Sequence, residues 1–132
     1  MLPVLQNRPD DILASGTHRG FDWVVMHNGM GFRCGYVRVP ADHPWAAIEW
    51  HGSSFDAGVR VHGGVTFVES DTYTDGRWIG FDCGHYGDAP DPNLPHRWTA
   101  SDMPMFSGDA VRTQGYVEYE CRSLCEQAAE AV

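Results

Sequence analysis

Two β-forming runs on either side of a glycine-rich break set the strongest constraint on the fold of this chain. The runs FDWVVMH and FRCGYVRV flank the segment NGMG. Within that segment, Asn28, Gly29 and Gly31 supply the positive φ angles that a tight connection requires. Pro40 ends the second run because proline cannot donate a hydrogen bond to a neighbouring strand. The sequence therefore predicts an antiparallel hairpin over residues 21–39.

A second pair of strand-like runs predicts another hairpin. The segment VRVHGGVTFV covers residues 59–68, and the segment RWIGFDC covers residues 77–83. The polar loop ESDTYTDG joins them and closes with Asp75-Gly76, a pair that is typical of turns between strands. The two hairpins together predict a mainly antiparallel sheet.

The C-terminal part of the chain carries the strongest helical pattern. Between Tyr116 and Ala129, apolar side chains recur at helical spacing and so fall on one face. These positions are Val117, Cys121, Leu124, Cys125 and Ala128. A further short helix is expected near residues 9–14. The predicted fold class is therefore α+β, with a mainly antiparallel sheet built from two hairpins and packed by a C-terminal helix.

Length and composition favour a single domain over residues 1–132. The chain has 42% hydrophobic and 20% charged residues, a globular balance that differs from that of a disordered chain. Residues 86–110 hold four prolines and few regular signals, which predicts a long proline-rich loop. A loop of this length is typical of a lid or a binding loop.

The acidic charge and the apolar pattern argue against several classes of function. A formal net charge of -9 repels a phosphate backbone, so nucleic-acid binding is not expected. No run approaches the roughly 18 apolar residues of a membrane span, and the N-terminus lacks a signal-peptide pattern. We therefore expect a cytoplasmic protein with no membrane partner. The four cysteines show no CxxC spacing, which argues against a structural zinc site.

The glycine-rich segments HGG and GFDCGHYGD hold the candidate catalytic residues. If the second hairpin pairs near its loop, His62, Asp82 and His85 gather at its open end, with His62 about opposite Cys83. A carboxylate that orients a histidine is suited to acid–base chemistry near neutral pH. The same imidazoles and carboxylate would also serve as ligands for a divalent metal, if one is present. The cofactor is otherwise unspecified.

Further residues of these segments and of the long loop are candidates for ligand binding. They are Gly63, Gly64, Cys83, Gly84, Asp88 and Arg97. Glycines inside a strand indicate a close approach by another group, either a ligand or an aromatic side chain. Cys83 beside a histidine is also a candidate nucleophile. In the structural alternative, Asp82 and Asp88 cap turns and His85 hydrogen-bonds to the backbone.

Four segments in succession resemble a family of small proteins, of no established function, that is common in bacteriophage genomes and prophages. They are HNGMGFRCGYVRVPADHPW, VHGGVTF, WIGFDCGHYGD and the helical YVEYECRSLCEQ. The resemblance covers about residues 21–127. It implies a phage origin, and with it a location in the cytoplasm of the bacterial host. The resemblance implies no particular cofactor, activity or catalytic residue.

Two hypotheses about function follow. In the first, the protein is a phage accessory protein whose Gly/His/Asp pocket binds or hydrolyses a small polar ligand, such as a nucleotide, to counteract host defence. In the second, it is an acidic interaction protein that inhibits a host protein by occlusion or mimicry and has no catalytic site. A mimic needs a row of exposed carboxylates, whereas the aspartates here concentrate in loops beside histidine and cysteine. This placement favours the pocket. The oligomeric state is open.

Overall fold

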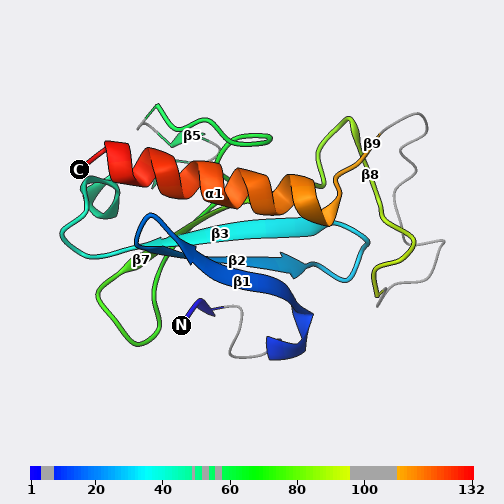
Figure 1. The fold of residues 1–132 in the computed structure, drawn as a ribbon, viewed down its shortest axis with the longest axis horizontal. Coiled ribbons are helices and arrows are strands. Elements are labelled where there is room, and N and C mark those ends of the chain that lie inside the picture. Colours follow the sequence, from blue (N-terminus) through cyan, green and yellow to red (C-terminus); the bar gives the residue numbers. More distant parts are fainter. Residues whose placement is uncertain (4–7, 49, 52–53, 56–57, 96–109) are drawn as a thin grey trace.

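The sheet forms from segments rich in β-branched and aromatic residues, which pack well on a pleated surface. The computed structural model describes residues 1–3, 8–48, 50–51, 54–55, 58–95 and 110–132. The main strands are β1 (Ile12–His18), β2 (Phe21–His27), β3 (Arg33–Val39), β6 (Phe67–Ser70) and β7 (Arg77–Asp82). They are all antiparallel and lie in the order β1-β2-β3-β7-β6 (Figure 1). With one long helix on this sheet, the predicted α+β class is confirmed.

Short elements connect and flank the sheet. They are the 3-10 turns η2 (Pro9–Asp11) and η3 (Pro44–Ala47) and the short strands β4 (Trp50–His51), β5 (Ser54–Phe55), β8 (Asp88–Ala89) and β9 (Ala110–Val111). Strands β4 and β5 pair with each other in antiparallel orientation, and β8 pairs with β9 in parallel orientation. The β8–β9 pair ties the start of the proline-rich segment to the residues just before the helix. Residues 96–109 of that segment lie outside the described part of the chain.

The first predicted hairpin is present as β2 and β3, but the expectation of a helix near residues 9–14 is wrong beyond its first residues. Only Pro9–Asp11 form a helical turn, and β1 starts at Ile12. Strand β1 pairs with β2 through a two-residue turn in which Arg19 has φ 54° and Gly20 has φ 83°. The chain therefore gains an edge strand where the sequence pattern predicts a helix.

The second predicted hairpin is shorter than expected, and its register differs by two residues. Val68 pairs with Ile79, and strand β6 begins at Phe67 instead of near residue 59. Gly63 and Gly64 have φ angles of 68° and 81°, which an extended strand does not allow. The chain therefore turns at the HGG segment and enters the sheet only after it.

Helix α1 (Gln114–Glu130) covers one face of the sheet with the predicted apolar stripe. Thr113 caps its N-terminus, since the Thr113 side chain accepts a hydrogen bond from the Tyr116 N–H at 3.3 Å. The core beneath the helix is formed by Trp23, Val25, Val37, Phe81, Cys83, Val117, Cys121, Leu124 and Cys125. Gly35 permits this packing, because a Cβ atom there would lie 2.5 Å from the Phe81 ring.

The opposite face of the sheet carries a second apolar cluster, which the N-terminal segment helps to cover. Its members are Leu2, Val24, Met26, Cys34, Tyr36 and Trp78. Leu2 is fully buried there, and the Met1 amino group forms an ion pair with Asp71. Asp71 also accepts a hydrogen bond from Trp78 Nε1 at 2.6 Å, so this carboxylate anchors the segment to β7.

Among the described residues, no helix combines the length and the apolar character needed to cross a lipid bilayer.

Candidate functional site

A buried carboxylate holds the imidazole of His62 at one end of the sheet. Nε2 of His62 lies 2.9 Å from both carboxylate oxygens of Asp88, whose side chain is 1% exposed. Nε of Arg112 donates to the same carboxylate at 2.7 Å, and the backbone N–H of His85 donates to it at 3.0 Å. Asp88 is therefore satisfied by donors from three separate parts of the chain.

Local structure brings these donors together. The turn from His85 to Asp88 closes with a hydrogen bond from the Asp88 N–H to the His85 carbonyl at 2.9 Å, and Gly87 supplies the positive φ of 96°. Pairing of β8 with β9 then places Arg112 beside Asp88. The turn at Gly63, which follows His62, is the reason that His62 leaves the direction of β6 and reaches this carboxylate.

The environment of Asp88 favours its ionised form. Burial by itself raises the pKa of the carboxyl, but the hydrogen bonds from His62, Arg112 and the His85 backbone lower the pKa by more. The hydrogen bond from Arg112 to Asp88 also raises the pKa of the Arg112 guanidinium. A negative charge is thus fixed behind His62, where it orients the ring.

The Tyr116 hydroxyl forms a hydrogen bond with the other ring nitrogen of His62, Nδ1. The hydroxyl oxygen lies 2.8 Å from Nδ1 of His62 and 3.4 Å from Oε1 of Glu120, so its one proton can be donated to either group. Burial, followed by the nearby charge of Glu120, raises the pKa of Tyr116, so the phenol keeps its proton. The Arg112 guanidinium stacks over the Tyr116 ring at 5.4 Å from its centroid and supports this position.

This arrangement accommodates both protonation states of His62. In the neutral ring, Nε2–H donates to Asp88 and Nδ1 accepts the Tyr116 hydroxyl proton. In the protonated ring, Nδ1–H donates to the Tyr116 oxygen, and the hydroxyl proton turns toward Glu120. The chain from Asp88 to Glu120 can therefore take up or release a proton without leaving a buried polar atom unpaired.

A second histidine–carboxylate pair lies next to the first. Nε2 of His85 is 3.3 Å from Oδ1 of Asp82, without the angular geometry of a hydrogen bond. Asp82 accepts hydrogen bonds from Oγ1 of Thr66 at 2.9 Å and from the Gly84 N–H at 3.1 Å. The His85 ring packs on bare backbone at Gly63, where a Cβ atom would lie 2.4 Å from the ring. The close approach expected at this glycine is thus made by His85.

The candidate catalytic residues are neighbours, and the two histidines face different carboxylates. The ring centroids of His62 and His85 are 6.2 Å apart. His62 pairs with Asp88, and Asp82 pairs with His85. Among the described residues, no group of three or more His, Cys, Asp or Glu side chains could hold a metal ion.

The candidate ligand-binding residues lie in different environments, and not all of them are accessible to a ligand. Cys83 is 2% exposed in the core, and burial, followed by the charge of Asp88, raises the pKa of its thiol, which does not suit a nucleophile. A Cβ atom at Gly84 would lie 3.3 Å from Oδ2 of Asp82, whereas Gly64 faces open space. Asp88 is the buried partner of His62 and also caps its own turn, as in the structural alternative. Arg97 lies outside the described residues.

An open cleft of about 810 Å³ adjoins the His62 pair, between the 58–62 segment and helix α1. Gln127 fixes the distance between these two walls, because its side chain accepts from the Arg60 N–H at 2.8 Å and donates to the Arg60 carbonyl at 2.7 Å. The lining residues are Gly58, Arg60, Val61, His62, Tyr119, Glu120, Ser123, Glu126, Gln127 and Glu130. Carboxylates therefore predominate over the single arginine of the lining.

In comparisons with known proteins, no family model, no curated protein and no solved structure matches this chain. The chemistry of the cleft and of the residues behind it is therefore the basis for a functional conclusion.

Sequence reasoning did not find Arg112, Tyr116 and Glu120, which complete the site. Tyr116 and Glu120 carry a weak signal, because both lie on the first turns of the predicted helix outside its apolar stripe. Nothing local links them to His62, which is 54 residues before Tyr116. The sequence-based expectation places the site on one hairpin, whereas the structure builds it from the HGG turn, the β8 turn and the helix.

Proposed function

We propose that the cleft beside His62 binds a small polar ligand and exchanges protons with it. One observation carries the proposal: the hydrogen-bonded series from Arg112 through Asp88, His62 and Tyr116 to Glu120 ends at the cleft, which His62 and Glu120 both line. Perturbed groups with a defined charge partner at the edge of a cleft are typical of functional sites.

The charge of the lining favours one kind of ligand. Glu120, Glu126 and Glu130 face the cleft, and Arg60 is the one arginine or lysine among the described lining residues. Such a surface attracts amino and hydroxyl groups and repels a free phosphate. A nucleoside or an amine fits this charge better than a nucleotide does, which sharpens the expectation of a nucleotide-like ligand.

The proposed roles of the residues follow from their positions. His62 and Glu120 would touch the ligand, and Tyr116 would pass a proton between them. Asp88 would be a positioning residue, because it holds the His62 ring and its tautomer from behind. The resemblance to small phage proteins extends the proposal to biology: binding or chemical change of a host signalling molecule would counteract a defence response.

A comparison of adenosine with adenosine monophosphate tests the binding proposal. We expect adenosine to shift the amide NMR signals of Val61 and Ser123, and the monophosphate to do so more weakly. His62→Gln and Glu120→Gln should weaken the response, whereas Glu118→Gln, which changes a carboxylate on the same helix outside the cleft lining, should not. In cells, a folded His62→Gln variant that retains full counter-defence activity would overturn the proposal.

The alternative, an acidic interaction protein, is favoured by one observation on the same helix. Glu126 and Glu130 are exposed on α1, beside Glu120, and the whole chain carries a net charge of -9. This row of carboxylates could cover a basic surface of a host protein. Replacing Glu118, Glu126 and Glu130 together by Gln would then abolish activity, while His62→Gln would leave it intact. The pocket proposal expects a large loss from His62→Gln.

A further inference from the structure

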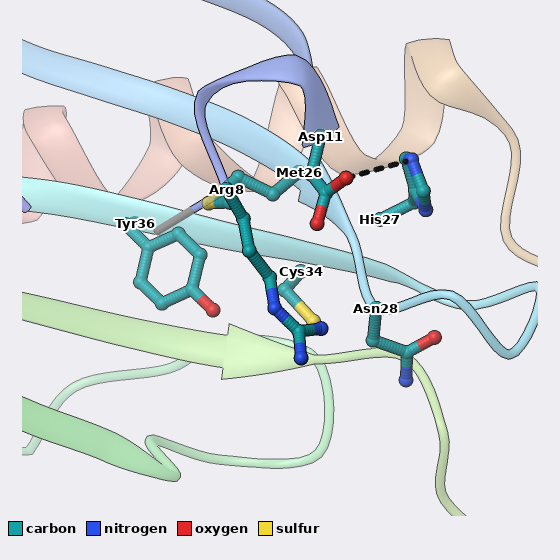
Figure 2. A pocket seen from close by; sticks show the side chains of 7 residues that line it. All are labelled: Arg8, Asp11, Met26, His27, Asn28, Cys34 and Tyr36. Atoms are coloured by element: carbon teal, nitrogen blue, oxygen red, sulfur yellow. Dashed lines mark ion pairs between the residues drawn. The ribbon is translucent and has the colours of Figure 1, made fainter. Parts of the chain in front are cut away.

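A separate pocket of about 360 Å³ lies on the sheet face opposite α1 (Figure 2). It is lined by Arg8, Asp11, Met26, His27, Asn28, Cys34 and Tyr36. Side chains alternate between the two faces of a strand, and Met26 and Cys34 belong to the apolar cluster away from the helix. The pocket therefore shares no residue and no face with the cleft beside His62.

The floor of this pocket is apolar and uncharged. Met26, Cys34 and Tyr36 are each less than a tenth exposed, at 4%, 8% and 8%. Burial raises the pKa of the Cys34 thiol to about 12, and burial also raises the pKa of Tyr36. Both groups therefore stay protonated at neutral pH. The floor thus offers a surface for a ring or a short aliphatic body, and it offers no nucleophile.

Asp11 is the acidic residue of the pocket lining, and its carboxylate faces His27 at one side of the pocket. The Gly29 N–H donates to Nδ1 of His27 at 3.2 Å, so the ring proton resides on Nε2. That nitrogen lies 3.6 Å from Oδ1 of Asp11, and Figure 2 shows the Asp11 carboxylate pointing toward His27. The negative charge of Asp11 is thus oriented to the histidine at one side of the pocket.

Arg8 brings to the mouth of the pocket a cation that has no partner among the described residues. Arg33, Arg38 and Arg112 are each held by a carboxylate at 3.0, 3.0 and 2.7 Å. In contrast, no described residue forms an ion pair or a hydrogen bond with the Arg8 guanidinium. In Figure 2 the Arg8 side chain runs away from Asp11 and across strand β3, toward Cys34. Its donors are therefore directed over the apolar floor.

We propose that this pocket binds a small organic carboxylate with an apolar body. The Arg8 guanidinium would take the carboxylate in a bidentate hydrogen-bonded pair, a geometry that arginine suits better than lysine does. Met26, Cys34 and Tyr36 would pack against the apolar body. The volume lies in the lower part of the range of about 300–1,000 Å³ for small-molecule sites. The inference is independent of the proposed function, because it uses a different face and an anionic ligand, which the carboxylates of the other cleft repel.

Benzoate and its neutral counterpart benzamide test the site. We expect benzoate to cause saturable shifts in the amide NMR signals of Met26, Asn28 and Cys34, and benzamide to bind at least about tenfold more weakly, because it lacks the charge that pairs with arginine. The signals of Val61 and Ser123 at the other cleft should not move. Equal binding of the two probes, or no saturable shift with benzoate, would overturn the proposal.

Variants of one arginine separate the proposal from general electrostatic attraction. Arg8→Gln should weaken benzoate binding at least about tenfold. Arg8→Lys keeps the positive charge but lacks the two parallel N–H donors of the guanidinium, so its affinity for benzoate should fall between those of Arg8→Gln and the unchanged protein. Arg19→Gln, in the exposed turn between β1 and β2, is the matched control and should bind as the unchanged protein does. His62→Gln should also leave benzoate binding unchanged. Full binding by Arg8→Gln would refute the role of Arg8.

Discussion

Nε2 of His62 lies 2.9 Å from both carboxylate oxygens of Asp88, although the two residues are 26 positions apart, with the β6–β7 hairpin between them. Asp88 is buried and ionised, and its other donors are Arg112 and the His85 backbone. This carboxylate therefore has two functions at once. It joins the β8 turn to the residues before α1, and it holds a proton on Nε2 of the neutral His62 ring, which leaves Nδ1 to accept from Tyr116.

Asp88→Asn should destabilise the protein by about 2–3 kcal/mol. The substitution leaves the His62 and Arg112 donors facing a neutral amide, and breaking one partner of a buried pair costs about 3–5 kcal/mol when both partners are fully buried. The expected loss is smaller because the Arg112 side chain is 29% exposed. Urea unfolding at pH 7 measures it. Asp75→Asn, in the exposed loop between β6 and β7, is the control and should change the free energy of unfolding by less than about 0.5 kcal/mol.

The cysteines should be unreactive in the folded protein. Cys34, Cys83, Cys121 and Cys125 are all buried and free. Burial is the largest cause of a raised pKa at each thiol, and the pKa of Cys34 and of Cys125 is raised to about 12. Ellman's reagent at pH 8 should therefore label them only as fast as the protein unfolds, and in urea all four should react at once. Rapid labelling of Cys83 in the native state would instead restore it as a candidate nucleophile.

The loss in the free energy of unfolding at acidic pH should depend on Asp71. Burial of this carboxylate opposes ionisation, but hydrogen bonds from the Met1 amine, Trp78 and the loop backbone hold its pKa well below the ordinary value. A lowered folded pKa stabilises the protein above the unfolded value of about 3.9, and this contribution is lost as the pH falls below it. Urea unfolding at pH 7, 5 and 3.5 should show little change between the first two and a clear loss at the third.

Asp71→Asn should make the free energy of unfolding less dependent on pH below about pH 4. It should also lower the free energy of unfolding at pH 7 by about 1–3 kcal/mol, because the hydrogen bonds to the ionised form contribute fully there. Asp10→Asn is the matched control, since Asp10 is exposed in η2. If Asp71→Asn keeps the full loss of stability below pH 4, that loss comes from other carboxylates. Asp88 and Asp91, whose pKa values are also lowered, would then be the next candidates.

Local patterns predicted the elements whose signals are contained within a few residues. The β2–β3 hairpin followed from the glycine-rich NGMG break, and α1 followed from a stripe that the structure buries at every predicted position. Strand β1 was missed for a physical reason. Its turn places the non-glycine residue Arg19 at φ 54°, and its edge position leaves several of its side chains exposed, so neither the turn signal nor a clean alternation is present.

The candidate site was located only roughly, because its contacts are non-local. Composition singled out His62, Asp82, His85 and Asp88, and all of them lie at one end of the sheet. The predicted register, with His62 about opposite Cys83, assumed that the HGG segment continues a strand. Positive φ angles at both glycines make it a turn and move His62 to Asp88. Tyr116 reaches His62 only through the packing of α1, which periodicity alone does not place.

The two glycines of the HGG segment offer a matched pair of substitutions. Gly63 and Gly64 have similar φ angles, of 68° and 81°, so alanine is strained by about 1–2 kcal/mol at either position. A Cβ atom at Gly63 would also lie 2.4 Å from the His85 ring, whereas a Cβ atom at Gly64 meets nothing within 4 Å. Gly63→Ala should therefore cost more than Gly64→Ala in urea unfolding, and it should displace the His85 ring signals in NMR spectra.

A double-mutant cycle with His85→Ala identifies the source of that difference. Once the imidazole is removed, the clash at residue 63 disappears and only the backbone strain remains. Gly63→Ala in the His85→Ala background should then cost about as much as Gly64→Ala does, and the coupling between residues 63 and 85 should exceed about 0.5 kcal/mol. No coupling is expected between Gly64→Ala and His85→Ala. If Gly63→Ala costs the same with and without the imidazole, His85 does not pack on this turn, and the close approach at Gly63 must come from another group.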